Sequence, residues 1–225
     1  MDQPNNDPSL IFAHPGSIEA LVGTTLLKKK GHSEKDRETL YHVEECSPDD
    51  FKHTHKYLAI LFSAHWCAPC KTFLSMLKEF YSEVNIDSKQ CEVLFVSLDR
   101  SEDEYKQYYA TMPWLAVPYS DGARAQALRQ RYRVNGIPQL VVVKSEDGAL
   151  VTLKGRKDLH EQGVKTIADW NKTVELNMER DEARRVEEAE LEALRLKLTQ
   201  LQLEKTMALQ QQQTESAVVI GAQLQ

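Results

Sequence analysis

Glycine and proline punctuate the first two thirds of this 225-residue chain and then almost disappear. The last proline is Pro138, and neither residue occurs in the 57 positions between Gly163 and Gly221. Because glycine and proline are the residues that most strongly interrupt helices, the C-terminal stretch can continue as one helix, whereas the residues before it must turn repeatedly. The sequence therefore divides into a punctuated N-terminal part and an unbroken tail.

Composition narrows the class of protein. Hydrophobic residues make up 41% of the chain and charged residues 28%, which is typical of a soluble globular protein. The net charge of −6 argues against broad nucleic-acid binding, and no apolar run approaches the roughly 20 residues that span a membrane. The N-terminus has no basic segment typical of a secretory signal, and four cysteines are too few for a disulfide scaffold. We therefore expect a cytoplasmic protein, with the nucleus left open.

Strands and helices alternate in the punctuated part. Apolar runs predict buried strands at 57–62 and 93–96. Helical spacing and capping residues predict helices over 68–81, 101–112 and 123–132. Two further apolar runs, 140–143 and 149–153, flank an Asp-Gly turn and predict a hairpin. This order predicts an α/β fold with a central mixed sheet flanked by helices.

The tail is expected to be helical from residue 158 onward. Ile167, Trp170 and Val174 share a helical face that can pack on the sheet. Farther on, leucines follow a 3-4-3 spacing at positions 191, 194, 198 and 201. This stripe indicates either a coiled coil or a helix folded onto its own domain, and it covers only about two heptads, fewer than the three or four that a convincing coiled coil shows. We favour binding to a second copy or to a partner helix.

These patterns predict three regions. Residues 1–15 read as a flexible N-terminal segment and 16–176 as the folded domain. Residues 177–225 read as a charged helical extension with a glutamine-rich end. Residues 28–40 read as a charged surface turn within the domain.

The strongest chemical signal is Cys67-Ala68-Pro69-Cys70, which follows a predicted buried strand and opens a predicted helix. A helix N-terminus presents unpaired N–H groups and a positive dipole end, which stabilise a thiolate at Cys67. Cys70 follows by nearly one turn, close enough to attack a disulfide formed on Cys67. Pro69 stiffens the first turn without losing a needed N–H group. The pattern predicts a redox-active dithiol.

Cys67 and Cys70 have two other interpretations, a zinc site and a pair of inert cysteines. A zinc site needs four ligands, and Cys46, Cys91 and His65 supply no second CxxC motif. Inert cysteines would be expected on an apolar face, not beside a tryptophan and a proline. We therefore expect no metal. Cys91 is expected to be a buried small hydrophobe, and Cys46 a bystander in a loop whose acidic neighbours raise its thiol pKa.

The segment from Phe62 to Lys71 resembles the active site of the thioredoxin superfamily, and within it the tryparedoxins and nucleoredoxins. Three other stretches support this likeness: 21–27 resembles the N-terminal hairpin of the family, 108–118 the segment after its second helix, and 136–140 its cis-proline loop. The resemblance covers residues 17–160, about two thirds of the chain. It implies a thioredoxin-like fold with the long C-terminal helix as an addition.

The resemblance also implies roles for particular residues. Cys67 would attack a substrate disulfide and Cys70 would resolve the mixed disulfide, so the pair forms the redox-active disulfide. Pro138, in a cis peptide, would lie against the sulfurs, with the Ile137 backbone offered to an extended substrate. Further substrate-binding positions implied are Trp66, Asp99 and Arg156, the last facing a carboxylate of the reductant.

Three positions depart from the family pattern. Leu61 occupies the place of a buried acid or tyrosine, so His65 or solvent would have to relay protons. Ala68 replaces the first of two prolines between the cysteines. Leu98-Asp99-Arg100 stands where the family usually has Trp-Asp-Glu, which keeps only the aspartate.

The expected function is that of an enzyme, a protein-disulfide reductase with no cofactor beyond its own dithiol. Electrons would come from a low-molecular-weight dithiol of the trypanothione or glutathione type, or from a reductase, and pass to protein disulfides such as those of peroxiredoxins. The alternative is a redox-switched binding module of nucleoredoxin type, assembled through residues 177–225.

Overall fold

The computed structural model describes the backbone of residues 15–30 and 43–223, and side chains up to residue 211. It divides into two compact units, the first ending at Lys172 and the second beginning at Thr173. The predicted flexible segment lies outside the described residues except for Pro15, as does most of the predicted charged turn at 28–40. Lys28 and Lys29 correct that prediction, because they belong to a strand.

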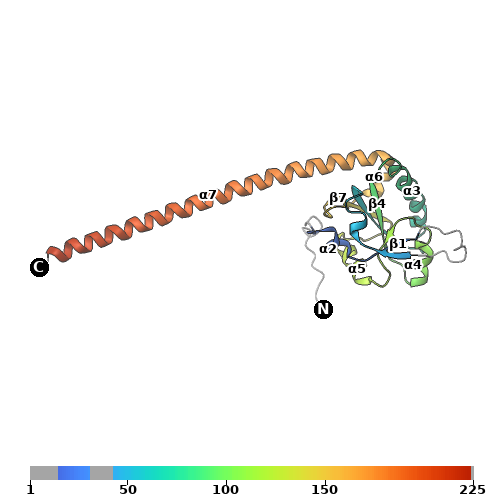
Figure 1. The fold of residues 1–225 in the computed structure, drawn as a ribbon, viewed down its shortest axis with the longest axis horizontal. Coiled ribbons are helices and arrows are strands. Elements are labelled where there is room, and N and C mark those ends of the chain that lie inside the picture. Colours follow the sequence, from blue (N-terminus) through green and yellow to red (C-terminus); the bar gives the residue numbers. More distant parts are fainter. Residues whose placement is uncertain (1–14, 31–42, 224–225) are drawn as a thin grey trace. The chain divides into compact units, whose positions relative to one another are not determined.

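A mixed sheet of seven strands forms the centre of the first unit (Figure 1). Its strands lie in the order β2-β1-β5-β4-β3-β6-β7. Their bounds are β1 Leu26–Lys29, β2 Val43–Cys46, β3 Tyr57–Ser63, β4 Cys91–Ser97, β5 Leu115–Ala116, β6 Gln139–Lys144 and β7 Leu150–Thr152. β3, β4 and β5 are parallel, whereas β6 pairs with β3 antiparallel and β1 with β5 antiparallel. The predicted mixed sheet is confirmed.

β3 is the central strand, and its sequence explains why. All seven residues of Tyr57–Ser63 are buried, because β4 and β6 pair with its two edges and helices cover both faces. An uninterrupted apolar run suits such a strand, since neither face meets water. The strand ends four residues before Cys67, so its pairing on both edges positions the residues that follow.

Helices flank the sheet on both faces. Their bounds are α2 Ile18–Val22, α3 Ala68–Val84, α4 Glu102–Tyr109, α5 Gly122–Arg131, α6 Gly155–Gln162 and α7 Thr166–Gln223, with short 3-10 turns at Pro48–Asp50 (η1) and Gly163–Lys165 (η2). Apolar side chains of α2 and α5 pack on the face that carries Leu58, Ile60 and Phe62. α4 packs on the opposite face, where Phe95 contacts its tyrosines.

Local capping sets the boundaries of α4. Ser101 accepts a hydrogen bond from the Glu104 N–H at 3.2 Å, which confirms it as the N-cap. Glu104 reaches back to the N–H of Arg100 rather than to that of Ser101. The helix ends at Tyr109, three residues earlier than predicted, because the chain turns ahead of Pro113.

The N-terminal hairpin is built differently from the expectation. Leu21 and Val22 end helix α2, and Gly23 follows with a φ of 89°. The hairpin itself is formed by β1 and β2, with Leu26 opposite Cys46. Cys46 is therefore a strand residue, which corrects its predicted place in a loop.

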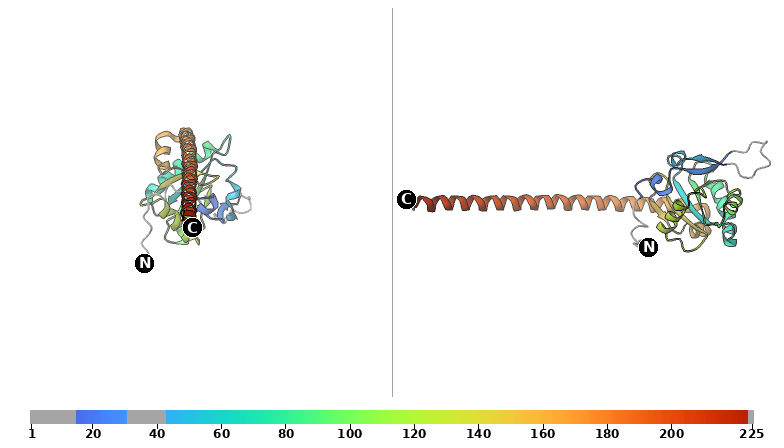
Figure 2. Two further views of the ribbon diagram at one scale, coloured as in Figure 1. Left: turned by 90° about the vertical axis from the view of Figure 1, so that its left-hand side faces the viewer. Right: turned by 90° about the horizontal axis from the view of Figure 1, so that it is seen from below.

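The C-terminal helical region is interrupted once, at Gly163, where φ is 56° and α6 has ended. α7 then begins at Thr166 and runs without a break to Gln223 (Figures 1 and 2). Its start belongs to the first unit, because Trp170 is buried against Tyr57 and Phe80. Among the described helices, none has the length and apolarity needed to cross a membrane.

Candidate active site

The two cysteines of the motif lie where β3 gives way to α3. Cys67 is the N-cap residue of α3, and Pro69 and Cys70 lie in its first turn. A disulfide joins Cys67 and Cys70, whose Cα atoms are 5.2 Å apart. Cys67 is 7% exposed and Cys70 only 1%, so the first sulfur is the more accessible one. Ala64, Leu98 and Ile137 pack around the pair.

The loop before β6 brings a distant segment against the sulfurs. Ile137–Pro138 is a cis peptide, as the sequence resemblance implied. The Ile137 carbonyl oxygen lies 3.8 Å from Cys67 Sγ, although 70 positions separate the two residues. In the reduced protein this oxygen is within reach of a Cys67 S–H donor. Cys67, Cys70, Ile137 and Pro138 are thus gathered at one place.

Trp66 stands beside the dithiol and is fixed by two contacts. Its Nε1–H donates to the Leu98 carbonyl oxygen at 3.2 Å, and the Arg100 guanidinium lies 5.1 Å from its ring centroid. The side chain is still 47% exposed. A large aromatic surface is therefore held in the open next to Cys67, and Arg100 is a contact that the sequence analysis did not foresee.

Asp99 holds the loop that leads into the motif. One carboxylate oxygen accepts the His65 N–H at 2.6 Å, and the other accepts the Ser97 hydroxyl at 2.7 Å. Burial raises the pKa of Asp99, although these two hydrogen bonds act in the opposite direction. Both carboxylate oxygens of Asp99 accept hydrogen bonds from the protein itself, so Asp99 positions the loop before Cys67 as well as lining the site.

Two open grooves meet at the cis-proline loop and share the residues Asn135–Ile137. The Trp66-side groove holds about 720 Å³ and is lined by Trp66, Asp99 and the start of α5. The α6-side groove holds about 1020 Å³ and is lined by Pro69, Pro138 and residues of α6. Arg156 is exposed in this second groove. The structure therefore places Asp99 and Arg156 on opposite sides of the loop.

A buried polar pair lies close to the site. Leu61 is fully buried, as the departure from the family pattern implied. Two residues along β3, the Ser63 hydroxyl lies 3.0 Å from the Tyr108 hydroxyl, and burial raises the pKa of Tyr108. The His65 ring contacts the Tyr108 ring at a centroid distance of 5.8 Å. The sequence analysis missed Ser63 and Tyr108, because nothing in either segment marks the pairing.

The other two cysteines are buried free thiols. Cys91 opens β4 and is fully buried, as predicted, and burial raises its pKa. Burial, followed by the nearby carboxylate of Asp50, raises the pKa of Cys46 to about 11. The predicted direction for Cys46 is correct, but burial is the main cause and not its acidic neighbours. Neither thiol is poised to react at neutral pH.

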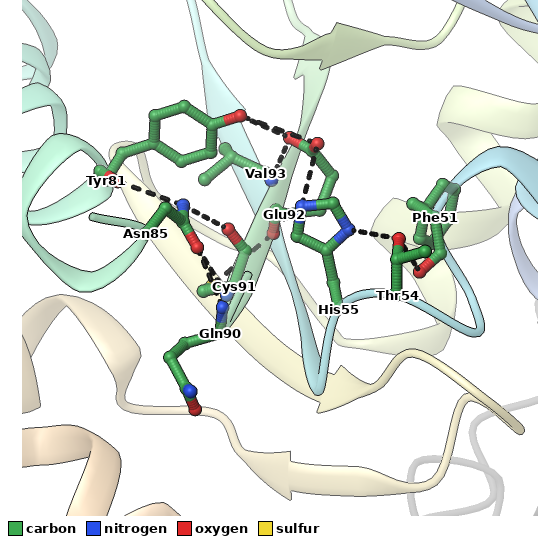
Figure 3. A network of polar contacts seen from close by, with 9 residues as sticks. All are labelled: Phe51, Thr54, His55, Tyr81, Asn85, Gln90, Cys91, Glu92 and Val93. Carbon is green, nitrogen blue, oxygen red and sulfur yellow. Dashed lines mark hydrogen bonds and ion pairs between the residues drawn. The ribbon is translucent and has the colours of Figure 1, made fainter. Parts of the chain in front are cut away.

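A second polar cluster lies at the other end of β4 (Figure 3). Glu92 accepts the Tyr81 hydroxyl at 3.2 Å and the Val93 N–H at 2.8 Å, and the His55 Nε2 lies 3.7 Å from its other oxygen. Burial raises the pKa of Glu92 to about 7 and lowers that of His55. His55 lies in a turn, and its side chain is buried against Glu92.

Comparison with known proteins agrees with this geometry. A family model described as thioredoxin-like matches residues 55–150. Nucleoredoxin of Danio rerio is 45% identical over 103 residues, which cover 46% of this chain and 24% of that protein. This match therefore spans about a quarter of the length of that nucleoredoxin.

Solved structures extend the likeness to most of the first unit. Tryparedoxin from Trypanosoma brucei is 30% identical with a TM-score of 0.53, covering 64% of this chain and 88% of that one. A tryparedoxin II structure in complex with glutathionylspermidine is 29% identical with a TM-score of 0.53, covering 63% and 88%. Fold, active-site geometry and sequence agree: the chain belongs to the tryparedoxin and nucleoredoxin branch of the thioredoxin superfamily.

Proposed function

We propose that this protein is a thiol–disulfide oxidoreductase that reduces protein disulfides, such as those of peroxiredoxins. Its electrons would come from a low-molecular-weight dithiol of the trypanothione or glutathione type, or from a reductase. The observation that carries the proposal is the position of Cys67, at the N-cap of α3 and 3.8 Å from the carbonyl oxygen of the cis-bonded Ile137.

The start of α3 and the burial of the two cysteines indicate which one attacks the substrate and which one resolves the mixed disulfide. The dipole of α3 favours a thiolate on the N-cap residue, Cys67. Cys67 is also the more exposed sulfur, so an incoming disulfide meets it first. Cys70 lies behind it, where it can attack Cys67 Sγ but not a bulky substrate.

The electron balance is that of two successive exchanges. The Cys67 thiolate attacks one sulfur of the target disulfide, which forms a mixed disulfide and releases the first target thiolate. The Cys70 thiolate then attacks Cys67 Sγ, which forms the Cys67–Cys70 disulfide and releases the second target thiolate. The target gains two electrons and, from solvent, two protons. A donor dithiol, or two molecules of a monothiol such as glutathione, reverses these steps on the protein and is itself oxidised to a disulfide, so no other cofactor is required.

Three further residues support substrate binding in this proposal. Trp66 offers an exposed aromatic surface beside Cys67, and Asp99 fixes the loop that carries it. Arg156 supplies a positive charge to a carboxylate of the reductant. A related tryparedoxin II binds glutathionylspermidine, which supports a low-molecular-weight thiol as the donor. We propose a cytoplasmic or nuclear location, because a dithiol reductase works in a reducing compartment.

Insulin reduction with a dithiol donor tests the proposal. We expect Cys67→Ser to abolish the reaction, and Cys70→Ser to accumulate a mixed disulfide between Cys67 and the substrate. Cys46→Ala is the matched control and should retain activity, since Cys46 is remote from the motif in the sheet and has a raised pKa. Full activity in Cys67→Ser would refute the proposed function.

The second unit favours one alternative, a redox-switched binding module. On α7 the leucines at 191, 194, 198 and 201 are 49–64% exposed, an apolar stripe that has no cover among the described residues. A homo-oligomer or a partner helix docked on residues 177–225 would bury it. The redox potential and the pKa of Cys67 separate the two functions, since an ordinary, sluggish thiol favours the binding module and an activated one favours the enzyme.

A further inference from the structure

Positive charge is concentrated in the α6-side groove. Its charged lining consists of four cations and one carboxylate: Arg133, Lys154, Arg156, Lys157 and Glu161. The protein as a whole carries a net charge of −6, so this groove is an exception on an acidic molecule. The Trp66-side groove, in contrast, is balanced, with Arg129 and Asp99 as its charged lining.

Two of these cations are available to a ligand. The single carboxylate, Glu161, lies 3.7 Å from the Lys157 Nζ one turn away on α6, so that pair is largely neutralised. Lys154 and Arg156 are exposed, and neither forms an ion pair with any residue in the described ranges 15–30 and 43–211. Their charges therefore remain to attract an anion.

The groove comes close to the reactive sulfur through the cis-proline loop, although Cys67 itself does not line it. Ile137 and Pro138 line it, and the Ile137 carbonyl oxygen lies 3.8 Å from Cys67 Sγ. Phe73 and Met76 of α3 add apolar surface to the lining. Its volume of about 1020 Å³ is at the upper limit of the roughly 300–1,000 Å³ typical of small-molecule pockets. A groove of this size and mixed lining suits a peptide segment better than a single carboxylate.

We propose that the α6-side groove receives an acidic segment of the protein whose disulfide is reduced, with carboxylates of that segment meeting Lys154 and Arg156. This inference rests on the proposed function and names its class of target. The two cations take no part in the electron transfer described above. They favour the encounter and orient the target disulfide towards Cys67, because charge complementarity chiefly affects association and partner choice.

Two synthetic peptides test this inference. Both contain the same intramolecular disulfide, and its cysteines are flanked by Glu-Glu in one peptide and by Gln-Gln in the other. Full-length protein is reduced beforehand and mixed with either peptide in a single turnover without donor. At low ionic strength we expect the acidic peptide to react about tenfold faster, which corresponds to about 1.4 kcal/mol shared between two exposed charge pairs. The ratio should fall towards one at about 0.5 M salt, where such pairs are screened.

Paired variants show whether the groove is responsible. Lys154→Gln with Arg156→Gln should remove the preference for the acidic peptide. Lys165→Gln with Lys172→Gln makes the same change in net charge at exposed positions that do not line the groove, and should keep it. An undiminished preference in the first variant, or an equal loss in both, would overturn the inference.

The outcomes also separate this inference from the function on which it depends. If wild-type protein reduces neither peptide, the proposed function itself fails. If it reduces both at the same rate, the function stands and the acidic-segment inference is overturned. Reduction of the oxidised protein by glutathione and by glutathione diethyl ester completes the test. If the Lys154/Arg156 variant keeps its peptide preference, the inference is wrong; weaker discrimination between these two donors in that case would leave Arg156 only the donor role proposed above.

Discussion

Glu92 gives this protein a pH-dependent stability whose sign follows from its burial. The carboxyl group is enclosed at the start of β4 by Tyr81, His55 and the Val93 N–H, with the positive charge of Lys89 acting on it from farther away. Burial raises its pKa from 4.5 to about 7. A carboxyl group whose pKa is raised by folding favours the folded state while it is protonated, and this contribution is lost as the pH rises through the folded pKa.

The size of this pH effect on stability follows from the pKa shift of Glu92. Each pKa unit corresponds to about 1.36 kcal/mol, so a rise from 4.5 to about 7 is worth roughly 3 kcal/mol between pH 4.5 and pH 8. Glu92→Gln removes the titration but keeps an oxygen that can accept from Tyr81 and Val93. We therefore expect the variant to gain roughly 3 kcal/mol relative to wild type as the pH rises from below 5 to 8.

Urea unfolding of the oxidised full-length protein, followed by tryptophan fluorescence at several pH values, measures this difference. His55 must be considered, because burial lowers its pKa and its own contribution is lost as the pH falls below 6.5. That contribution has the opposite sign and is present in both proteins, so it largely cancels when wild type and Glu92→Gln are compared. His55→Asn in both backgrounds measures what remains.

A pH-independent difference between Glu92→Gln and wild type would refute this reasoning. So would a wild type that gains stability over the variant as the pH rises, because the carboxyl group would then be better stabilised as an anion. The first result would mean that the Glu92 side chain is effectively hydrated, and the second that its hydrogen bonds and the charge of Lys89 outweigh burial.

Three other changes test separate parts of the structure. Asp99→Ala leaves the His65 N–H without its acceptor, so we expect the free energy of unfolding in urea to fall by about 1–3 kcal/mol and insulin reduction to slow. Unchanged kinetics of insulin reduction would contradict the positioning role of Asp99. Trp170→Ala should lower the free energy of unfolding by about 3–5 kcal/mol, because it leaves a cavity at a buried aromatic site. A loss below about 1 kcal/mol would show that the start of α7 does not stabilise the first unit. Leu194→Glu with Leu198→Glu should lower the mass measured by light scattering if α7 assembles through its leucine stripe, and an unchanged mass would count against assembly.

Much of the fold could be predicted because its elements are marked by neighbouring residues. The uninterrupted apolar run at 57–62 predicted β3, and the structure extends it by one residue to Ser63. The helix that contains Cys70 was also predicted, over 68–81, although α3 continues three residues farther, to Val84, since nothing at Tyr81 stops it. Ends of elements were less accurate, because a helix such as α4 ends where the next turn begins to form and not where its periodicity fades.

The candidate site was predicted only in part. The positions of Cys67 and Cys70 were evident, since the strand, the N-cap and the first turn are consecutive residues. The contact of Arg100 with Trp66 and the hydrogen bond between Asp99 and His65 were not, because they join the end of β4 to the loop after β3. Parallel pairing of these two strands creates those contacts, and no local pattern records it.

The sequence by itself determined that this chain carries a dithiol at a helix N-terminus, followed later by a 57-residue helical stretch free of glycine and proline. Helix capping, the helix dipole and a three-residue cysteine spacing act between adjacent positions, so the order of residues is enough to predict them. Only the tertiary structure decided that Arg100 meets Trp66, that Lys154 and Arg156 line one groove, and that Glu92 is buried. Burial, local charge and pKa depend on which distant segments the sheet brings together, and that information lies in the packing of the whole domain.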